Sequence, residues 1–240
     1  MDCVCLQIAL DKLLNETMEA LRNINKEILI EFRQRYIGPT IRKYGNMLRV
    51  VDCPESGLAN RVGSVDLRLL SGKTAVHCDP IIWYRDEKVE VAALQIIDSL
   101  FSTLQFSVRI DQMNNEQKAM VQNYMAFMIE HKELLQDSPI EAKEPQNLYP
   151  EVRVKDEEQE IIALYSTGRV VEIDSQRECT IIVNGTKAEE IYIKADGKLA
   201  VEIVQIDCCG KLVREEKTVL SGIRSVNCTM AGRIEIKKGK

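Results

Sequence analysis

The sequence lacks the features that mark several large classes of protein. It has no excess of basic residues, because 32 Lys and Arg stand against 37 Asp and Glu, a formal net charge of −5. Proteins whose main partner is nucleic acid or an anionic membrane usually carry a basic surface, so we expect neither partner. Only 12 Gly and 6 Pro occur in 240 residues, and 45% of the residues are apolar. This composition is typical of a globular chain rather than a disordered one.

Long hydrophobic runs are also missing. The most apolar long stretch, residues 89–108, is interrupted by Glu90, Asp98 and Gln105, whereas a membrane span needs about 20 mainly apolar residues. The opening MDCVCLQIALDKLLNE has no basic region and no small-residue cleavage site, so we predict no signal peptide and a cytoplasmic location. The eight cysteines are then expected to be reduced thiols rather than disulfides.

Metal ligands are scarce. The chain has two histidines, His77 and His131, and the pairs Cys3/Cys5 and Cys208/Cys209 lack the spacing of a zinc site. We predict no metal and no cofactor.

The first part of the chain alternates between short apolar segments and helical patterns. A helical spacing of apolar residues covers residues 6–23. The segments typical of buried parallel strands are 27–32, 46–51, 74–77 and 105–108, and the helical patterns between and after them are 55–71, 87–102 and 114–135. The strand starts lie 19, 27 and 31 residues apart, and a (β/α)8 barrel of about 250 residues averages about 31 per unit. Four such units predict half of a TIM-type barrel.

The second part of the chain has a different period. The helical pattern ends in a proline-containing stretch, and beyond it apolar and polar residues alternate with period two. Asp196-Gly197 predicts a hairpin turn, and Asn184-Gly185 and Cys209-Gly210 predict further turns. We therefore divide the chain into a half barrel (1–136), a linker (137–150) and an all-β antiparallel sandwich (151–240).

Polar side chains follow each predicted strand of the first part. They are Glu31 and Arg33, then Asp52, then His77 and Asp79, and finally Arg109 and Asp111. In barrels the chemistry lies at the carboxyl ends of the strands. A single polar residue at a strand end is often only a cap, but the same pattern on four strands favours a site.

Other interpretations of these residues are open at this point. Asp52 could cap the helix that follows it. His77 and Asp79 could be metal ligands, although hydrogen bonds to a polar ligand or to one another fit better, because no further histidine is close in sequence. Arg33 and Arg61 could be plain surface charges, yet they flank Asp52 in the pattern, and guanidinium groups bind carboxylates and sugar hydroxyls well.

The run from ILIEFRQ (28–34) to SVRID (107–111) resembles the later barrel half of melibiase-type α-galactosidases, glycoside hydrolase family 36. The resemblance covers roughly residues 6–137, and the predicted sandwich resembles the C-terminal domain of these enzymes. It implies barrel strands five to eight and a retaining mechanism with two carboxylates. One aspartate, after the fourth strand, is the nucleophile, and another, after the sixth, is the acid/base.

Under this resemblance Asp52 matches the acid/base. Arg61, in LANR, matches an arginine expected one helical stretch later, and IEFRQ, with Glu31 and Arg33, takes the fifth-strand position that shapes the sugar pocket. His77 and Asp79 complete the expected substrate-binding set. The strand with the nucleophile is expected before residue 1.

We therefore expect the C-terminal portion of a retaining α-glycosidase, inactive by itself. Its expected partners are an α-galactoside or related oligosaccharide, and either a second copy of the chain or the missing N-terminal barrel half. The alternative is a non-catalytic carbohydrate-binding or assembly module derived from such an enzyme.

Overall fold

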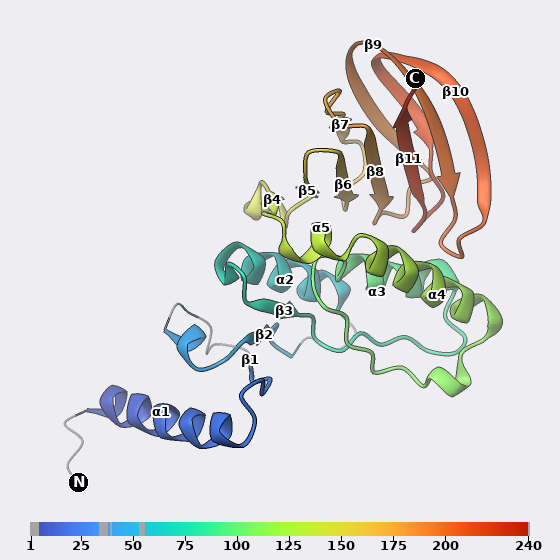
Figure 1. The fold of residues 1–240 in the computed structure, drawn as a ribbon. Coiled ribbons are helices and arrows are strands. Elements are labelled where there is room, and N and C mark those ends of the chain that lie inside the picture. Colours follow the sequence, from blue (N-terminus) through green and yellow to red (C-terminus); the bar gives the residue numbers. More distant parts are fainter. Residues whose placement is uncertain (1–4, 34–37, 39, 53–55, 240) are drawn as a thin grey trace.

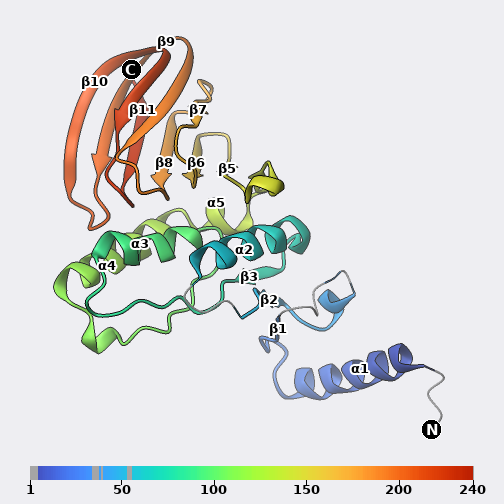
Figure 2. The same ribbon diagram turned by 180° about the vertical axis from the view of Figure 1, so that it is seen from behind.

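The chain is built in layers. A computed structural model describes residues 5–33, 38, 40–52 and 56–239. A small parallel sheet, a layer of helices and a large sheet follow one another along the molecule, and the first helix lies apart at one end (Figures 1 and 2). The architecture is a mixed α/β one with a large multi-stranded sheet.

Three short parallel strands form the small sheet. They are β1 (Glu31–Arg33), β2 (Met47–Arg49) and β3 (Ala75–His77), in this order across the sheet. These strands lie within three of the segments predicted from the sequence. The register places Arg33 beside Arg49 and Arg49 beside His77.

The two faces of the small sheet differ because successive side chains of a strand point to opposite sides. One face carries Phe32, Leu48 and Val76, which pack with Leu67 of the helix behind them. The other face carries the residues between them, including Arg49 and His77. The apolar face therefore holds the sheet to α2, and the polar face points away from that helix.

The segment predicted as a fourth strand, residues 105–108, is not a strand, so that prediction was wrong. Two isolated parallel bridges, from His77 to Thr103 and from Ile81 to Phe106, join this part of the chain to the end of β3 and the residues after it. The backbone N–H of Gln105 donates to Cys78 Sγ (3.2 Å) rather than to a carbonyl, and Pro80 has no N–H to donate. The ladder is interrupted for these two reasons.

The predicted helices are all found. They are α1 (Leu6–Ile24), α2 (Gly57–Ser71), α3 (Val89–Asp98), α4 (Asn115–Glu130) and α5 (Lys132–Asp137), with short 3-10 turns at Ile41–Lys43, Ile110–Gln112 and Pro145–Asn147. The helix predicted over 114–135 is divided at His131 into α4 and α5. None of the helices in the described chain has the length and apolarity needed to cross a membrane.

The large sheet contains eight strands. They are β4 (Glu141–Ala142), β5 (Glu151–Lys155), β6 (Gln159–Leu164), β7 (Val170–Glu172), β8 (Cys179–Asn184), β9 (Glu190–Ile206), β10 (Leu212–Asn227) and β11 (Arg233–Lys238). The order is β10-β9-β11-β8-β6-β5-β4, with β7 paired to β9. The expectation of a wholly antiparallel arrangement is corrected by two parallel pairs, β6–β8 and β7–β9. After β6 the chain forms β7, which pairs with β9. It then returns to form β8, which lies beside β6 and runs parallel to it.

The hairpin predicted at Asp196-Gly197 does not form. Both residues lie inside β9, and the register of the β9–β10 pair shifts opposite them, at Ser221/Gly222. Gly197 (φ +78°) and Gly222 (φ +64°) adopt the left-handed conformation that glycine tolerates. The two strands therefore bulge together and the ribbon bends, as Figure 1 shows. The predicted turn at Cys209-Gly210 does join β9 to β10, where Asp207 accepts the backbone N–H groups of Cys209 and Lys211.

The helix layer packs on the large sheet through one buried core. Ile97 of α3 and Tyr124 of α4 pack in a single cluster with Val152 of β5 and Ile181 of β8. The Tyr124 hydroxyl also donates to the Ala231 carbonyl (2.5 Å) beside β11. Burying this apolar area, worth about 25 cal/mol per Å2, holds the helices to the large sheet, while the separate cluster around Leu67 holds the small sheet to α2.

Candidate functional site

Arg49 joins the ends of all three parallel strands. Its Nη1 lies 2.9 Å from Asp79 Oδ1, its Nε 3.2 Å from Glu31 Oε1, and its Nη2 3.6 Å from Asp52 Oδ1. The side chain of Arg49 is buried, with the residue 8% exposed. A guanidinium presents its donors in a rigid planar fork, so one side chain holds three carboxylates, one from the first residue of β1 and two from the segments that follow β2 and β3. We call these residues, together with Arg33, His77 and Gln105, the strand-end cluster.

Asp79 is the fixed member of the strand-end cluster. It is 5% exposed, and the side chain of Asn60 in α2 pairs with its backbone. The Asn60 amide donates to the Asp79 carbonyl (2.8 Å), and the Asp79 N–H donates to Asn60 Oδ1 (2.9 Å). This reciprocal pair replaces the backbone ladder that ended with β3. The sequence pattern did not single out Asn60, and its place in LANR next to Arg61 was the available signal.

His77 and Gln105 hold the carboxylate of Glu31 from the other side. His77 Nδ1 lies 3.1 Å from Glu31 Oε2, and Gln105 Nε2 lies 3.2 Å from the same oxygen. Gln105 Nε2 is also 2.9 Å from His77 Nδ1. A ring nitrogen either donates or accepts at one time, so Nδ1 bonds Glu31 when protonated and Gln105 when not. Gln105 was missed because its segment was taken for a buried strand.

Asp52 is the carboxylate of the cluster that solvent reaches. Its side chain is 54% exposed, and Arg33 Nη1 lies 2.8 Å from Oδ1. The interpretation of Asp52 as a helix cap is wrong, because α2 begins at Gly57 and Ser56 is its N-cap, accepting the Ala59 N–H at 3.3 Å. Cys53 and Pro54 lie outside the described residues. A ligand approaching the strand ends therefore meets Asp52 and Arg33 first.

Arg61 does not join the cluster, although the sequence pattern placed it beside Asp52. Its Nη1 donates to Asp98 Oδ1 (3.1 Å), its Nη2 donates to the Leu148 carbonyl (3.2 Å), and its guanidinium lies 4.2 Å from the ring centre of Tyr165. Successive residues of a helix are rotated by about 100°. Asn60 faces the strand ends, so Arg61 faces the large sheet.

The polar residues after the predicted fourth strand also lie apart. Arg109 and Asp111 form an exposed ion pair with each other (2.8 Å), with side chains 71% and 64% exposed. In the described part of the chain, no group of three or more His, Cys, Asp or Glu residues could hold a metal ion. The cluster offers hydrogen-bond donors and acceptors and an accessible carboxylate.

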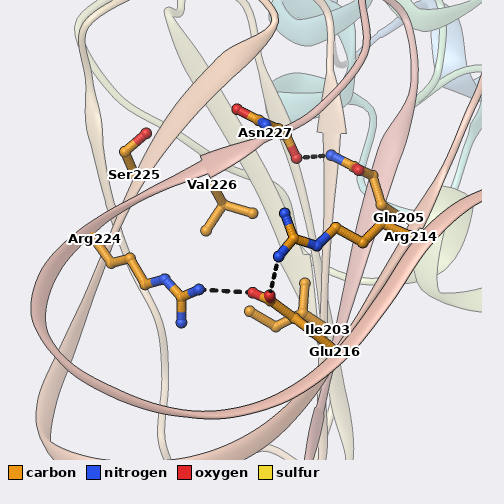
Figure 3. Close-up of a pocket in the computed structure, with 8 residues that line it drawn as sticks. All are labelled: Ile203, Gln205, Arg214, Glu216, Arg224, Ser225, Val226 and Asn227. Atoms are coloured by element: carbon orange, nitrogen blue, oxygen red, sulfur yellow. Dashed lines mark hydrogen bonds and ion pairs between the residues drawn. The ribbon is translucent and has the colours of Figure 1, made fainter.

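A hollow of about 100 Å3 lies inside the bent β9–β10 ribbon (Figure 3). Glu216 binds both Arg214 and Arg224, at 2.7 Å each, and the Gln205 amide donates to the Asn227 carbonyl. These side chains are occupied with one another, and Arg224 and Glu216 belong to parts of β10 on opposite sides of the bulge. The hollow thus reflects how the ribbon is held in its bent shape.

Comparison with known proteins gives little guidance. No family model matches this sequence, and no curated protein matches it at a significant level. Among solved structures, a xyloglucanase of glycoside hydrolase family 44 from Paenibacillus polymyxa aligns with a TM-score of 0.40 at 8% identity. The alignment covers 95% of this chain and 50% of that enzyme, so the chain spans about half its length. A likeness at this level carries no argument, so the functional conclusion depends on the strand-end cluster alone.

Proposed function

We propose that this chain supplies the acid/base carboxylate and part of the sugar site of a retaining glycosidase of the α-galactosidase type. The observation that carries the proposal is the convergence of Glu31, Asp52 and Asp79 on the guanidinium of Arg49. Ligands of parallel β/α sheets bind at the carboxyl ends of the strands. Asp52 and Asp79 follow the carboxyl ends of β2 and β3, and this supports the proposal.

The proposal includes the architecture expected from the resemblance. Residues 1–136 would be the second half of a TIM-type barrel, with β1 to β3 as its fifth to seventh strands. Residues 137–150 would be the linker, and 151–240 the β-sandwich. The parallel order of the three strands and the helices packed on one of their faces support this.

The substrate we propose is an α-galactoside or a related oligosaccharide. The hydroxyl groups of a sugar both donate and accept hydrogen bonds. Arg33 supplies donors, Glu31 supplies acceptors, and His77 supplies either. Asp79, which is almost fully buried, would act by holding Arg49 rather than by touching the sugar.

Asp52 would transfer the proton. A proton donor is the neutral carboxylic acid, and in the present structure Asp52 is paired with Arg33 and Arg49. Sugar binding would therefore have to draw Arg33 away, so that Asp52 can be protonated and face the glycosidic oxygen. The nucleophile would come from the other barrel half, whose last strand would pair with the edge of β1.

The pairing of Asp52 with two arginines also favours the second candidate function, a carbohydrate-binding module without turnover. Such a module needs the donors and acceptors of the cluster but no free acid. This chain would then contain the residues needed for binding a sugar but not those needed for catalysis.

The proposal is tested first by sugar binding. Calorimetric titration with galactose and with raffinose should show saturable binding that Arg33→Ala and Asp52→Ala weaken. Asp196→Ala, which removes a carboxylate that is 91% exposed on β9 and lies outside the cluster, should bind as the unaltered chain does. Absence of binding to the unaltered chain would overturn both candidate functions.

The acid/base role is tested in an enzyme rebuilt with the N-terminal barrel half of a family 36 enzyme. Asp52→Ala should slow substrates with poor leaving groups far more than activated aryl galactosides, which leave without a proton. Added azide should restore turnover of the activated substrate and form a glycosyl azide. Equal losses for both kinds of substrate, with no rescue, would leave only the binding function.

A further inference from the structure

The loop of residues 82–87 lies at the same end of the small sheet as the strand-end cluster. Beyond β3 the chain still runs beside the predicted fourth segment: the Ile81 N–H donates to the Gln105 carbonyl (2.8 Å), and the Ser107 N–H donates to the Ile81 carbonyl (2.9 Å). The loop begins directly after this contact. It therefore leaves from the carboxyl end of the third strand, where ligands of such sheets bind.

A hollow of about 200 Å3 opens beside this loop. Trp83, Tyr84, Ser107, Met113 and Gln117 are among the residues that line it, and we call it the Trp83 hollow. Trp83 is 5% exposed, and its ring meets the Phe106 ring edge to face, with centroids 6.0 Å apart. Its Nε1 has no hydrogen-bond partner among the described residues. Buried indole N–H groups usually find one.

Gln117, from the first turn of α4, leaves a second buried atom unpaired. Its Nε2 donates to the carbonyls of Tyr84 (3.1 Å), Arg85 (3.2 Å) and Glu87 (3.2 Å). The amide cannot be reversed, because its oxygen would then face three carbonyl oxygens. The atom without a partner among the described residues is therefore Oε1, an acceptor, on a residue 1% exposed.

We propose that the Trp83 hollow is a second sugar-binding site, separate from the strand-end cluster. A sugar hydroxyl oxygen would accept from Trp83 Nε1, and a sugar O–H would donate to Gln117 Oε1. Tyr84, 62% exposed at the loop, offers an aromatic surface for the C–H face of the sugar ring. The inference rests on the proposed function only for the class of ligand.

A hydroxylated ligand fits these atoms better than an anion. Sulfate or a carboxylate accepts hydrogen bonds but has no proton to donate to Gln117 Oε1. Two arginines also line the hollow: Arg109 is already paired with Asp111 at 2.8 Å, and because of the charge of Arg85 an anion is included in the test. A neutral hydroxyl group both donates and accepts hydrogen bonds, so hydroxyl groups can pair with Trp83 Nε1 and with Gln117 Oε1.

The chain carries its own reporters for the test. Trp83 is its only tryptophan, and His77 and His131 are its only histidines. In an isotope-labelled sample titrated with raffinose, the indole N–H signal of Trp83 reports on the hollow and the ring signals of His77 report on the strand-end cluster. His131, packed against Phe127 on α4 (ring centroids 4.7 Å apart), serves as the internal reference.

We expect the Trp83 signal to shift saturably with raffinose, both in the unaltered chain and in Asp52→Ala. Trp83→Phe keeps an aromatic ring but removes the N–H, and should weaken calorimetric binding to the hollow about fivefold. Inorganic sulfate, which has no proton to donate, should leave the Trp83 signal in place.

Each other outcome has a definite meaning. A shift of His77 alone would overturn the second site and leave the proposed function standing. A shift of Trp83 alone would support the second site and count against the strand-end cluster. No shift of Trp83 at saturating raffinose means that the hollow holds only water, and an equal shift with sulfate means that it is an anion site. Either result overturns the proposal.

Discussion

Arg49 and Asp79 form a buried ion pair, with 2.9 Å between Nη1 and Oδ1, that joins the end of β2 to the end of β3. Their side chains are 10% and 7% exposed, so neither charge is solvated when the other is lost. Removing one partner of a buried pair usually costs about 3–5 kcal/mol. Arg49→Met should lower the free energy of unfolding by that amount in urea titrations, whereas Arg33→Ala, at an exposed pair, should cost about 1 kcal/mol or less. Recovery of most of the loss in Arg49→Met/Asp79→Leu would show that the buried charge is the cause, and equal losses for Arg49→Met and Arg33→Ala would contradict this account.

Substitutions of Ser56 and Asp52 are expected to change different properties, the stability of the fold and the affinity for sugar. Ser56 caps α2, so Ser56→Ala should cost about 1 kcal/mol of unfolding free energy and leave sugar affinity unchanged. Asp52 is half exposed, and Asp52→Ala should cost less than about 1 kcal/mol while weakening sugar binding. The reverse pattern, in urea titration and calorimetry, would return Asp52 to a structural role.

Asp98 should make stability depend on pH. Burial raises the pKa of the Asp98 carboxyl to about 6, although Arg61 acts in the opposite direction. The value in an unfolded chain is about 3.9, so the unfolded state loses its proton first as the pH rises. Stability should therefore fall between about pH 4 and pH 6, by up to about 3 kcal/mol at 1.36 kcal/mol per unit, and change no further above it.

The measurement is the urea midpoint at a series of pH values. The difference between the unaltered chain and Asp98→Asn isolates this carboxyl from the others that titrate in the same range. Asp111→Asn, at an exposed position, is the matched control. A difference between the unaltered chain and Asp98→Asn that stays constant from pH 4 to pH 7 would refute the assignment.

The 240-residue chain should not hydrolyse aryl α-galactosides. A retaining enzyme needs a second carboxylate about 5–5.5 Å from the acid/base that can reach the anomeric carbon. The other carboxylates of the cluster, Glu31 and Asp79, are both held by Arg49, and Asp79 is nearly inaccessible. Phenol release should stay at the buffer rate. Robust turnover that Asp52→Ala and Glu31→Ala each abolish would identify Glu31 as a nucleophile.

The chain is expected to associate with itself through α1. Met18 is the one residue of this helix that is buried in the described structure, while Leu6, Leu10 and Leu13, one helical face, are exposed. Exposed apolar stripes of this kind mark association surfaces. Sedimentation at micromolar concentration should show dimers or larger species, which Leu10→Lys/Leu13→Glu converts to monomer. Leu69→Lys on α2, also exposed, is the control, and a monomeric unaltered chain would disprove the expectation.

The order of helices and strands in the first part was predictable from the sequence, because apolar periodicity records which face of each element is buried. Residues 6–23 and 55–71 became α1 and α2 almost as expected. The polar strand ends were equally visible, because Glu31, Asp52 and His77 each interrupt a short apolar run. The local pattern alone therefore pointed to the carboxylates of the cluster, but not to Arg49, Asn60 or Gln105, which hold them.

Only the tertiary structure decided which of these residues meet. Arg49 was one arginine among several in the sequence, and the parallel pairing of three strands makes it the partner of three carboxylates. Arg61 turned to Asp98 because one helical step separates it from Asn60. Asp196-Gly197 became a bulge because a long partner strand was available to continue the ladder. Pairing between residues far apart in the chain depends on registers and rotations that local sequence patterns do not contain.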